Sequence, residues 1–162
     1  MTEAVAAKYG LGTEQVRSGH GRMTSLGRDV GFTFDFERVQ LGNTFDAHRL
    51  AQAVRGDPAE PSLVRGLFQA HFTEGRLLSD RAVLRDVAAA AGVDGFLVED
   101  VLQSDRYGSE VRADEAAAYE LGVTGVPYFL IAGAWPIPGA QDTETLGIVL
   151  RRAWSRLGGD DG

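Results

Sequence analysis

The side chains available for chemistry in this chain are limited by the absence of cysteine. Without a thiol the 162 residues can form no disulfide, no thiolate metal site and no cysteine nucleophile. Histidine, aspartate, glutamate, serine, tyrosine and main-chain groups remain as candidates. The chemistry open to them is acid–base catalysis, metal binding through imidazole or carboxylate groups, and capture of a ligand by backbone hydrogen bonds.

Two histidines lie within helix-compatible segments, His48 in DAHRL and His71 in QAHFT. A metal-binding helix commonly places two histidines four residues apart, and neither of these has such a partner. We expect both to be partly buried helix residues whose ring nitrogens are hydrogen-bonded. The sequence therefore predicts no metal site and no cofactor.

The charged side chains that stand close together also have structural explanations. Asn43 is suited to cap a helix, and Asp46 and Arg49 have the three-residue spacing of an ion pair on one helix face. Catalytic acids would need a shared cleft and shifted pKa values, whereas the carboxylates of a later segment are expected to line a solvated helix face. These are Glu110, Asp114, Glu115 and Glu120. We predict no catalytic side chain in the chain.

One candidate site remains, in the stretch GVTGVPYFLI at residues 122–131. Its functional residues would be Thr124, Val126 and Pro127, holding an extended peptide or a small thiol through main-chain contacts. The alternative is that these residues only shape the turn that enters a strand. Tyr128 and Trp135 are close by in sequence and are expected to be core aromatic residues.

The first 39 residues predict two helices followed by an extended segment. The first helix, at residues 2–9, stops at Gly10, and Thr13 is suited to cap the second, which runs to about residue 30. At residues 31–39, Phe32, Phe34 and Phe36 alternate with polar residues. This period of two is typical of a half-buried extended segment, here with its phenylalanine face on the core.

Residues 43–121 predict a block of consecutive amphipathic helices. Gly56, Pro58 and Pro61 break the chain between the first two of them. The residues suited to begin or end the helices are Asn43, Ser79 or Asp80, Gly92, Asp94 and Gly122. These boundaries place helices at residues 43–54, 62–74, 80–91, 94–102 and 107–121.

The pattern changes after Gly122, where aromatic and β-branched residues predict a hairpin at residues 126–137 with its turn at Ala132 and Gly133. A last amphipathic helix follows. Its apolar stripe consists of Leu146, Val149, Leu150, Ala153 and Trp154. Residues 158–162 predict a disordered tail.

Composition restricts the class of protein. With 44% hydrophobic and 24% charged residues, the chain is typical of one globular domain. A net charge of −7 argues against nucleic acid as a partner, because phosphate binding requires clustered basic residues. No apolar run approaches the roughly 20 residues that span a bilayer. The first ten residues do not read as a secretory signal, so the expected location is cytoplasmic.

Several segments resemble the DsbA-like thioredoxin-fold family, and in particular its FrnE branch of proposed polyketide-associated dithiol oxidoreductases. They are KYGL at residues 8–11, NTFDAHRL at 43–50, LFQAHFTEG at 67–75, VRADEAAAYELGVTGVPYF at 111–129 and GAQ at 139–141. The resemblance extends over nearly the whole chain. It implies an α/β thioredoxin-like fold of the DsbA type.

The same resemblance implies that part of the family's fold is missing. Family members begin with a strand, a Cys-x-x-Cys at the start of a helix and a further strand, and no such segment is present here. We therefore expect residues 1–162 to form one incomplete DsbA-like domain, with a helical insertion at 43–121 and the C-terminal hairpin and helix of the thioredoxin fold at 122–157. The resemblance also implies a cis peptide bond between Val126 and Pro127.

The resemblance and the absence of cysteine leave three possible functions. The chain is a redox-inactive part of a DsbA-like thiol-disulfide oxidoreductase, or a non-catalytic module that binds a peptide or thiol through the cis-proline loop. A weaker alternative is a relative of the glutathione-dependent isomerases, whose catalytic serine would also lie in the missing segment. A two-stranded hairpin without neighbouring strands exposes unpaired main-chain groups, which leads us to expect a homo-oligomer that covers them.

Overall fold

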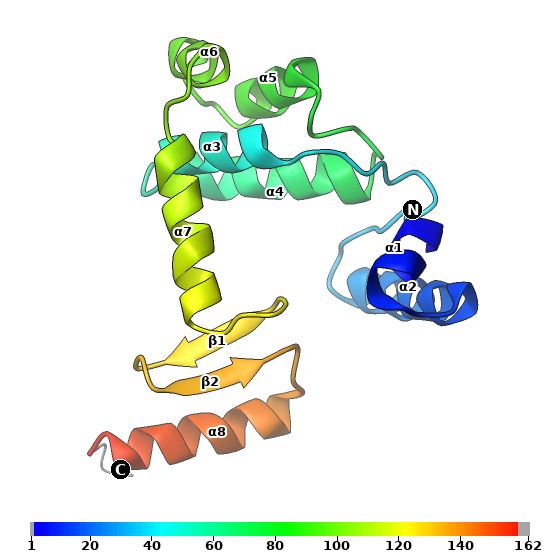
Figure 1. The fold of residues 1–162 in the computed structure, drawn as a ribbon, viewed down its shortest axis with the longest axis vertical. Helices are drawn as coiled ribbons and strands as arrows, with labels where there is room; N and C mark the ends of the chain where they lie inside the picture. Colours follow the sequence, from blue (N-terminus) through cyan, green and yellow to red (C-terminus); the bar gives the residue numbers. More distant parts are fainter. Residues whose placement is uncertain (1, 159–162) are drawn as a thin grey trace. The chain divides into compact units, whose positions relative to one another are not determined.

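The computed structural model describes residues 2–158 (Figure 1). It is a helix-rich α/β protein with a small two-stranded sheet, as the sequence predicts. The chain divides into two compact units, residues 1–112 and residues 113–162, with the boundary inside helix α7. Except for Gly158, the tail predicted to be disordered lies outside the described residues.

The two predicted N-terminal helices are present as α1 (Thr2–Tyr9) and α2 (Thr13–Asp29), which pack on each other. The cap of α2 differs from the prediction. Thr13 is already the first helical residue, and Gly12 occupies the cap position. The side-chain oxygen of Gln15 accepts a hydrogen bond from the Gly12 N–H at 3.0 Å, which satisfies a donor that the helix leaves free.

The segment after α2 forms no strand with any described residue, although its side chains alternate as predicted. Phe32, Phe34 and Phe36 are half-buried and contact one another. The rings of Phe34 and Phe36 stack 5.3 Å apart, and the ring of Phe32 is tilted against that of Phe34 at 4.8 Å. Phe72 contacts Phe34 edge-on at 5.6 Å, and His20 stacks on Phe36 at 4.2 Å. The alternation therefore reflects an aromatic cluster between α2 and α4, not a sheet.

The first four helices of the predicted helical block are α3 (Phe45–Ala53), α4 (Glu60–Phe72), α5 (Arg81–Ala90) and α6 (Gly95–Gln103), visible in the upper part of Figure 1. The carboxylates of Asp80 and Asp94 accept hydrogen bonds from the N–H groups of Ala82 and Phe96, as expected of N-caps. Asn43 lies one residue before the cap position of α3, and its side-chain oxygen accepts from the Phe45 N–H at 2.8 Å.

Helix α4 begins two residues earlier than predicted. Pro61 lies in its first turn, where the missing N–H of proline interrupts no intrahelical bond, so the residue does not break the chain there. Within this block α3 packs on α4 and α6, and α5 packs on α4 and α6. The most deeply buried side chains of this core are Leu50, Leu63, Leu84, Val101 and Leu102.

Helix α7 (Gly108–Glu120) leads into the hairpin of β1 (Tyr128–Ile131) and β2 (Trp135–Pro138), which is followed by α8 (Thr143–Arg156). The strands are antiparallel and pair Phe129 with Ile137. Ala132 and Gly133 both have positive φ at the predicted turn. On α8 the predicted apolar stripe is only partly covered. Ala153 is buried, whereas Leu150 and Trp154 are 48% and 57% exposed.

No helix in the described part of the chain is both long enough and apolar enough to cross a membrane.

Candidate functional site

The loop between α7 and β1 contains the predicted main-chain site. At the end of α7, Gly122 has a φ of 73° and the N–H of Val123 donates to the carbonyl of Ala118, a pairing that terminates a helix. The chain then bends through residues 125–127 before β1 begins. The peptide bond between Val126 and Pro127 is cis.

Two hydrogen bonds hold this loop against the hairpin. The Pro127 carbonyl accepts from the Gly139 N–H at 2.8 Å, which continues the ladder of β1 and β2 by one pair. The Tyr128 hydroxyl donates a hydrogen bond to the carbonyl of Leu121 at 3.3 Å. The side chain of Tyr128 is half-buried. Trp135 is also half-buried, so neither aromatic residue is the fully buried core residue expected.

The loop residues themselves face solvent. Thr124, Val126 and Pro127 are all exposed, and Val126 is 89% exposed. No hydrogen bond joins the main chain of Thr124, Gly125 or Val126 to another described residue. Consecutive free N–H and C=O groups on an exposed, fixed loop are the groups with which an extended peptide pairs. The loop is therefore chemically able to bind a backbone.

The start of α8, next to the hairpin, is fixed by Asp142. Its carboxylate accepts from the Thr145 N–H at 2.7 Å and from the Thr145 hydroxyl at 3.0 Å. These bonds, the main-chain one foremost, lower the pKa of Asp142 below its usual value. Gln141, in the GAQ segment, donates to the Pro138 carbonyl at 2.9 Å and ties the end of β2 to this cap.

A pH prediction follows from this cap. Because the folded pKa of Asp142 is depressed, its contribution to stability is present above the unfolded pKa of about 3.9 and is lost as the pH falls through the folded value. We expect Asp142→Ala to lower the helix signal of α8 in NMR at pH 7, and the difference from the unchanged chain to vanish in strong acid. Asp142→Asn is the matched control, since it keeps a capping oxygen without a titrating group. If the difference in the α8 helix signal between Asp142→Ala and the unchanged chain were the same at pH 2 as at pH 7, Asp142 would not be the titrating cap of α8.

The two histidines are brought together by the fold. His48 on α3 and His71 on α4 line one cavity of about 320 Å³ whose other walls are mainly apolar side chains of the same two helices. Neither histidine fully matches the prediction of a partly buried side chain with hydrogen-bonded ring nitrogens. His48 is exposed, and the buried Nδ1 of His71 has no hydrogen-bond partner. Burial lowers the pKa of His71. No three potential metal ligands gather anywhere in the described residues.

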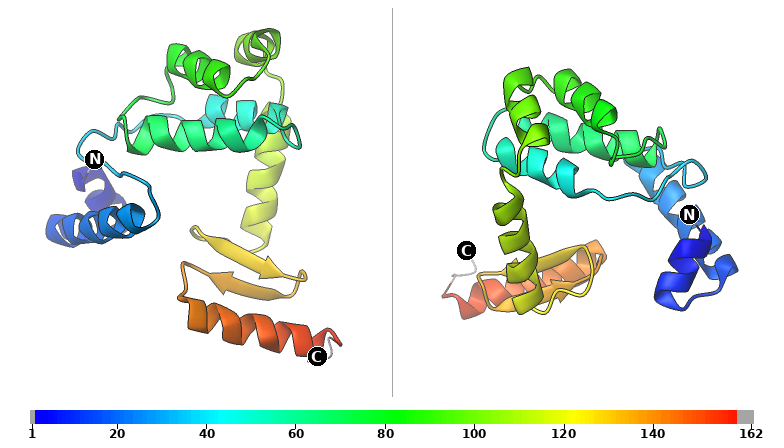
Figure 2. Two further views of the ribbon diagram at one scale, coloured as in Figure 1. Left: turned by 180° about the vertical axis from the view of Figure 1, so that it is seen from behind. Right: turned by 45° about the horizontal axis from the view of Figure 1, so that its top comes forward.

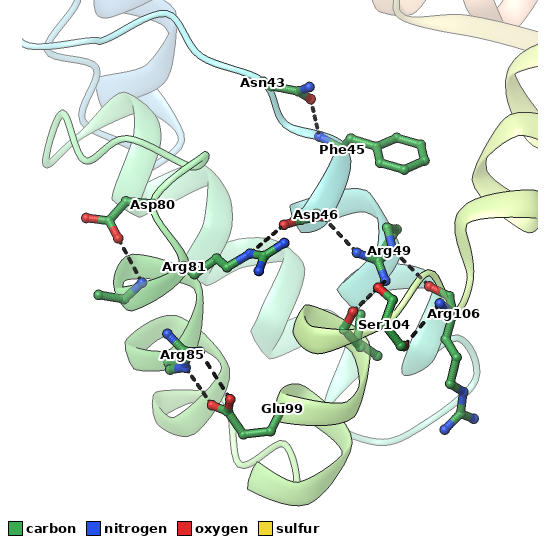
Figure 3. Close-up of polar contacts among 12 residues, drawn as sticks. Asn43, Phe45, Asp46, Arg49, Asp80, Arg81, Arg85, Glu99, Ser104 and Arg106 are labelled. Carbon is green, nitrogen blue, oxygen red and sulfur yellow. Dashed lines mark hydrogen bonds and ion pairs between the residues drawn. The ribbon is translucent and has the colours of Figure 1, made fainter.

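Arg49 has a larger role than the predicted ion pair with Asp46, which is present at 2.8 Å (Figure 3). The guanidinium is buried, with a side chain 4% exposed, and also donates to the carbonyls of Val101, Ser104 and Arg106 at the end of α6. Asp46 in turn accepts from Arg81 at 3.1 Å. The cluster joins α3 to α6 and lies in the helical core, so its role is structural.

The four carboxylates of α7, Glu110, Asp114, Glu115 and Glu120, are exposed, as expected of a solvated helix face. Sequence patterns missed two features of the helical block. Phe68 has the spacing of a core residue and is nevertheless 53% exposed, beside the aromatic cluster. The carbonyl acceptors of Arg49 lie more than fifty residues away in the chain, so no local signal indicates them.

A helical block followed by a cis-proline loop, an antiparallel hairpin and a terminal helix defines an α/β protein of the thioredoxin-like class. The profile of the DSBA-like thioredoxin domain matches residues 3–150. The chain therefore belongs to the DsbA-like thioredoxin domain family, and the resemblance in its sequence is confirmed at this level.

Solved structures agree with this assignment. The chain is similar to a probable DsbA oxidoreductase from Streptomyces coelicolor, with 32% identity and a TM-score of 0.84 over 95% of this chain and 67% of that one. It also shares the fold of a candidate protein disulfide isomerase from Nitrosomonas europaea, with 20% identity and a TM-score of 0.68 over 90% of this chain and 74% of that one. No curated protein sequence matches significantly.

Proposed function

We propose that this chain is the substrate-binding part of a FrnE-like thiol-disulfide oxidoreductase and carries out no dithiol chemistry by itself. The observation that supports this proposal is that the chain belongs to the DsbA-like family and that its 162 residues contain no cysteine. Thiol-disulfide exchange proceeds by attack of a thiolate on a disulfide sulfur. No group in this chain can perform that attack.

The proposal assigns each part of the DsbA-like fold to a range of residues. Residues 1–162 form one incomplete DsbA-like domain, in which 43–121 are the helical insertion and 122–157 the hairpin and helix of the thioredoxin fold. The cysteine pair would be supplied by a segment outside these residues. The aligned Streptomyces coelicolor chain is longer, since this chain covers 67% of it, which leaves room there for such a segment.

A thiol-disulfide exchange assay tests this function. We expect the chain to reduce insulin with dithiothreitol no faster than buffer does. A version lengthened upstream in the same reading frame is the matched comparison, and an encoded Cys-x-x-Cys should bring turnover with it. Catalysis by the cysteine-free chain above the buffer rate would refute the proposal. A lengthened chain without a cysteine pair would refute the assignment of the missing segment.

A second candidate function is the binding of an extended peptide, or of a small thiol, without catalysis. It is favoured by the free main-chain groups of Thr124, Gly125 and Val126 on an exposed loop. A peptide strand placed there would form main-chain hydrogen bonds with these residues, and the neighbouring side chains would set its preference. This binding needs no cysteine, so it is open to the chain as it stands.

Chemical-shift mapping tests peptide binding. On titration with unstructured ten-residue peptides, we expect the amide signals of Thr124 to Val126 to move most and those of α5 to stay unchanged. Val126→Pro is the informative variant, because it removes one main-chain donor from the loop while leaving the ladder of β1 and β2 complete. Shifts spread evenly over the surface, or equal binding by Val126→Pro, would contradict this candidate.

A further inference from the structure

The loop that contains the main-chain site has few contacts of its own. Between Val123 and Tyr128 every side chain is exposed, Thr124 and Val126 included. A Cβ added at Gly125 would meet no atom within 4 Å, so no other described part of the chain packs against the loop there. Glycine also has the most conformational freedom to lose when a chain becomes ordered. The order of this loop therefore depends on what holds its two ends.

Main-chain hydrogen bonds hold the two ends of the loop to different elements. At the first end, the N–H of Val123 donates to the carbonyl of Ala118 at 3.0 Å and completes the last turn of α7. At the second end, the Pro127 carbonyl accepts from the Gly139 N–H and extends the ladder of the hairpin. Among the described residues, no main-chain bond joins α7 to either strand. Main-chain pairing therefore fixes each end but not the distance between the ends.

A side-chain hydrogen bond of Tyr128 joins the two ends. Tyr128 is the first residue of β1, and its hydroxyl donates to the carbonyl of Leu121 at 3.3 Å. Leu121 directly follows α7, where a helix leaves its last carbonyls without internal partners, and no described N–H of the main chain donates to this carbonyl. The bond closes residues 122–127 into a ring. Ring closure removes conformations that an open loop could adopt.

We propose that Tyr128 is a positioning residue of the main-chain site, whose hydroxyl holds Thr124 to Val126 in the conformation that pairs with a peptide strand. The hydroxyl acts through the loop and not on the peptide. A loop that is already ordered in its bound conformation loses less entropy on binding, so it binds the peptide more tightly. The ligand in this inference rests on the second candidate function, whereas the order of the loop is a property of the chain without ligand.

NMR relaxation of backbone amides tests the order of the loop without any ligand. Tyr128→Phe keeps the ring and removes the hydroxyl, so the order parameters at residues 124–126 should fall from about 0.85 to below about 0.6, while those of β1 and β2 stay unchanged. Tyr119→Phe is the matched control, because Tyr119 is 84% exposed and should leave the loop rigid. Equal loop order in both variants would overturn the proposal. Loosening of the whole hairpin in Tyr128→Phe would overturn it as well, because the hydroxyl would then stabilise the sheet.

Titration with the same unstructured ten-residue peptides measures the consequence for binding. Because one hydrogen bond orders the loop, Tyr128→Phe should raise the Kd about two- to tenfold, whereas Tyr119→Phe should leave it unchanged. A mobile loop in Tyr128→Phe with the Kd of the parent chain would contradict the positioning role. If the parent chain binds no peptide, the second candidate function fails. The relaxation result alone then still confirms or overturns the ordering of the loop by Tyr128.

Discussion

Replacing Arg49 with methionine is expected to lower the free energy of unfolding by about 3–5 kcal/mol, the usual cost of removing one partner from a buried ion pair. The guanidinium is the shared donor for the carbonyls of Val101, Ser104 and Arg106. These carbonyls lie at and just beyond the end of α6, where a helix has no internal partners for its last C=O groups. Methionine fills similar space but leaves the carbonyls unpaired.

Urea denaturation followed by circular dichroism measures this effect, and Arg81→Ala provides the matched control. Arg81 binds the same carboxylate, Asp46, but its side chain is 52% exposed. Exposed pairs contribute about 0–1 kcal/mol, so the control should cost less than 1 kcal/mol. If Arg49→Met proves as mild as Arg81→Ala, the buried cluster does not stabilise the helical block as described.

Replacing Gly75 with alanine is expected to be the second most damaging change, and its damage should spread to the aromatic segment. Gly75 has a φ of 68°, and an added Cβ would lie 2.5 Å from the Arg38 carbonyl oxygen and 2.6 Å from the Arg38 Cβ. The contact is with main-chain atoms, so the segment carrying Arg38 must move. The side-chain amide of Gln40, which donates to the Gly75 carbonyl at 2.8 Å, would be displaced with it.

Gly92→Ala is the control, because Gly92 has a similar φ of 80° and no atom within 4 Å of the added Cβ. The left-handed conformation alone costs a non-glycine residue about 1–2 kcal/mol. The steric clash at Gly75 should add about 1–3 kcal/mol, as overpacking does elsewhere. Hydrogen exchange at residues 35–40 should rise in Gly75→Ala and not in Gly92→Ala. Equal stabilities would show that the contact with Arg38 relaxes freely.

Much of the fold is predictable from local chemistry. Asp80 and Asp94 begin helices because their carboxylates bind N–H groups two residues further along the chain, a contact that needs no tertiary partner. Gly122 and the turn at Ala132 and Gly133 are local in the same sense. The family was recognisable because its motifs are short runs of residues, such as the Thr-Gly-Val-Pro step.

The periodicity of the sequence correctly predicted which side chains are buried, but it did not predict which residues cover them. Phe32, Phe34 and Phe36 are half-buried as their alternation indicates, but Phe72 and His20 cover them in place of a neighbouring strand. A period of two reports only that alternate side chains face one way. Figure 2 shows this segment as an irregular connection between α2 and α3.

The sequence by itself determined the helical block, the hairpin, the family and the absence of cysteine, because each depends on residue type or on contacts within a few residues. Only the tertiary structure decided the burial of Arg49 and the shared cavity of His48 and His71, which join residues from different helices. It also decided that Pro136 and Pro138 face outward from the hairpin, since that depends on which cross-strand pairs bond. Long-range pairing of this kind leaves no local pattern, because nothing in the neighbouring residues changes when a distant partner is present or absent.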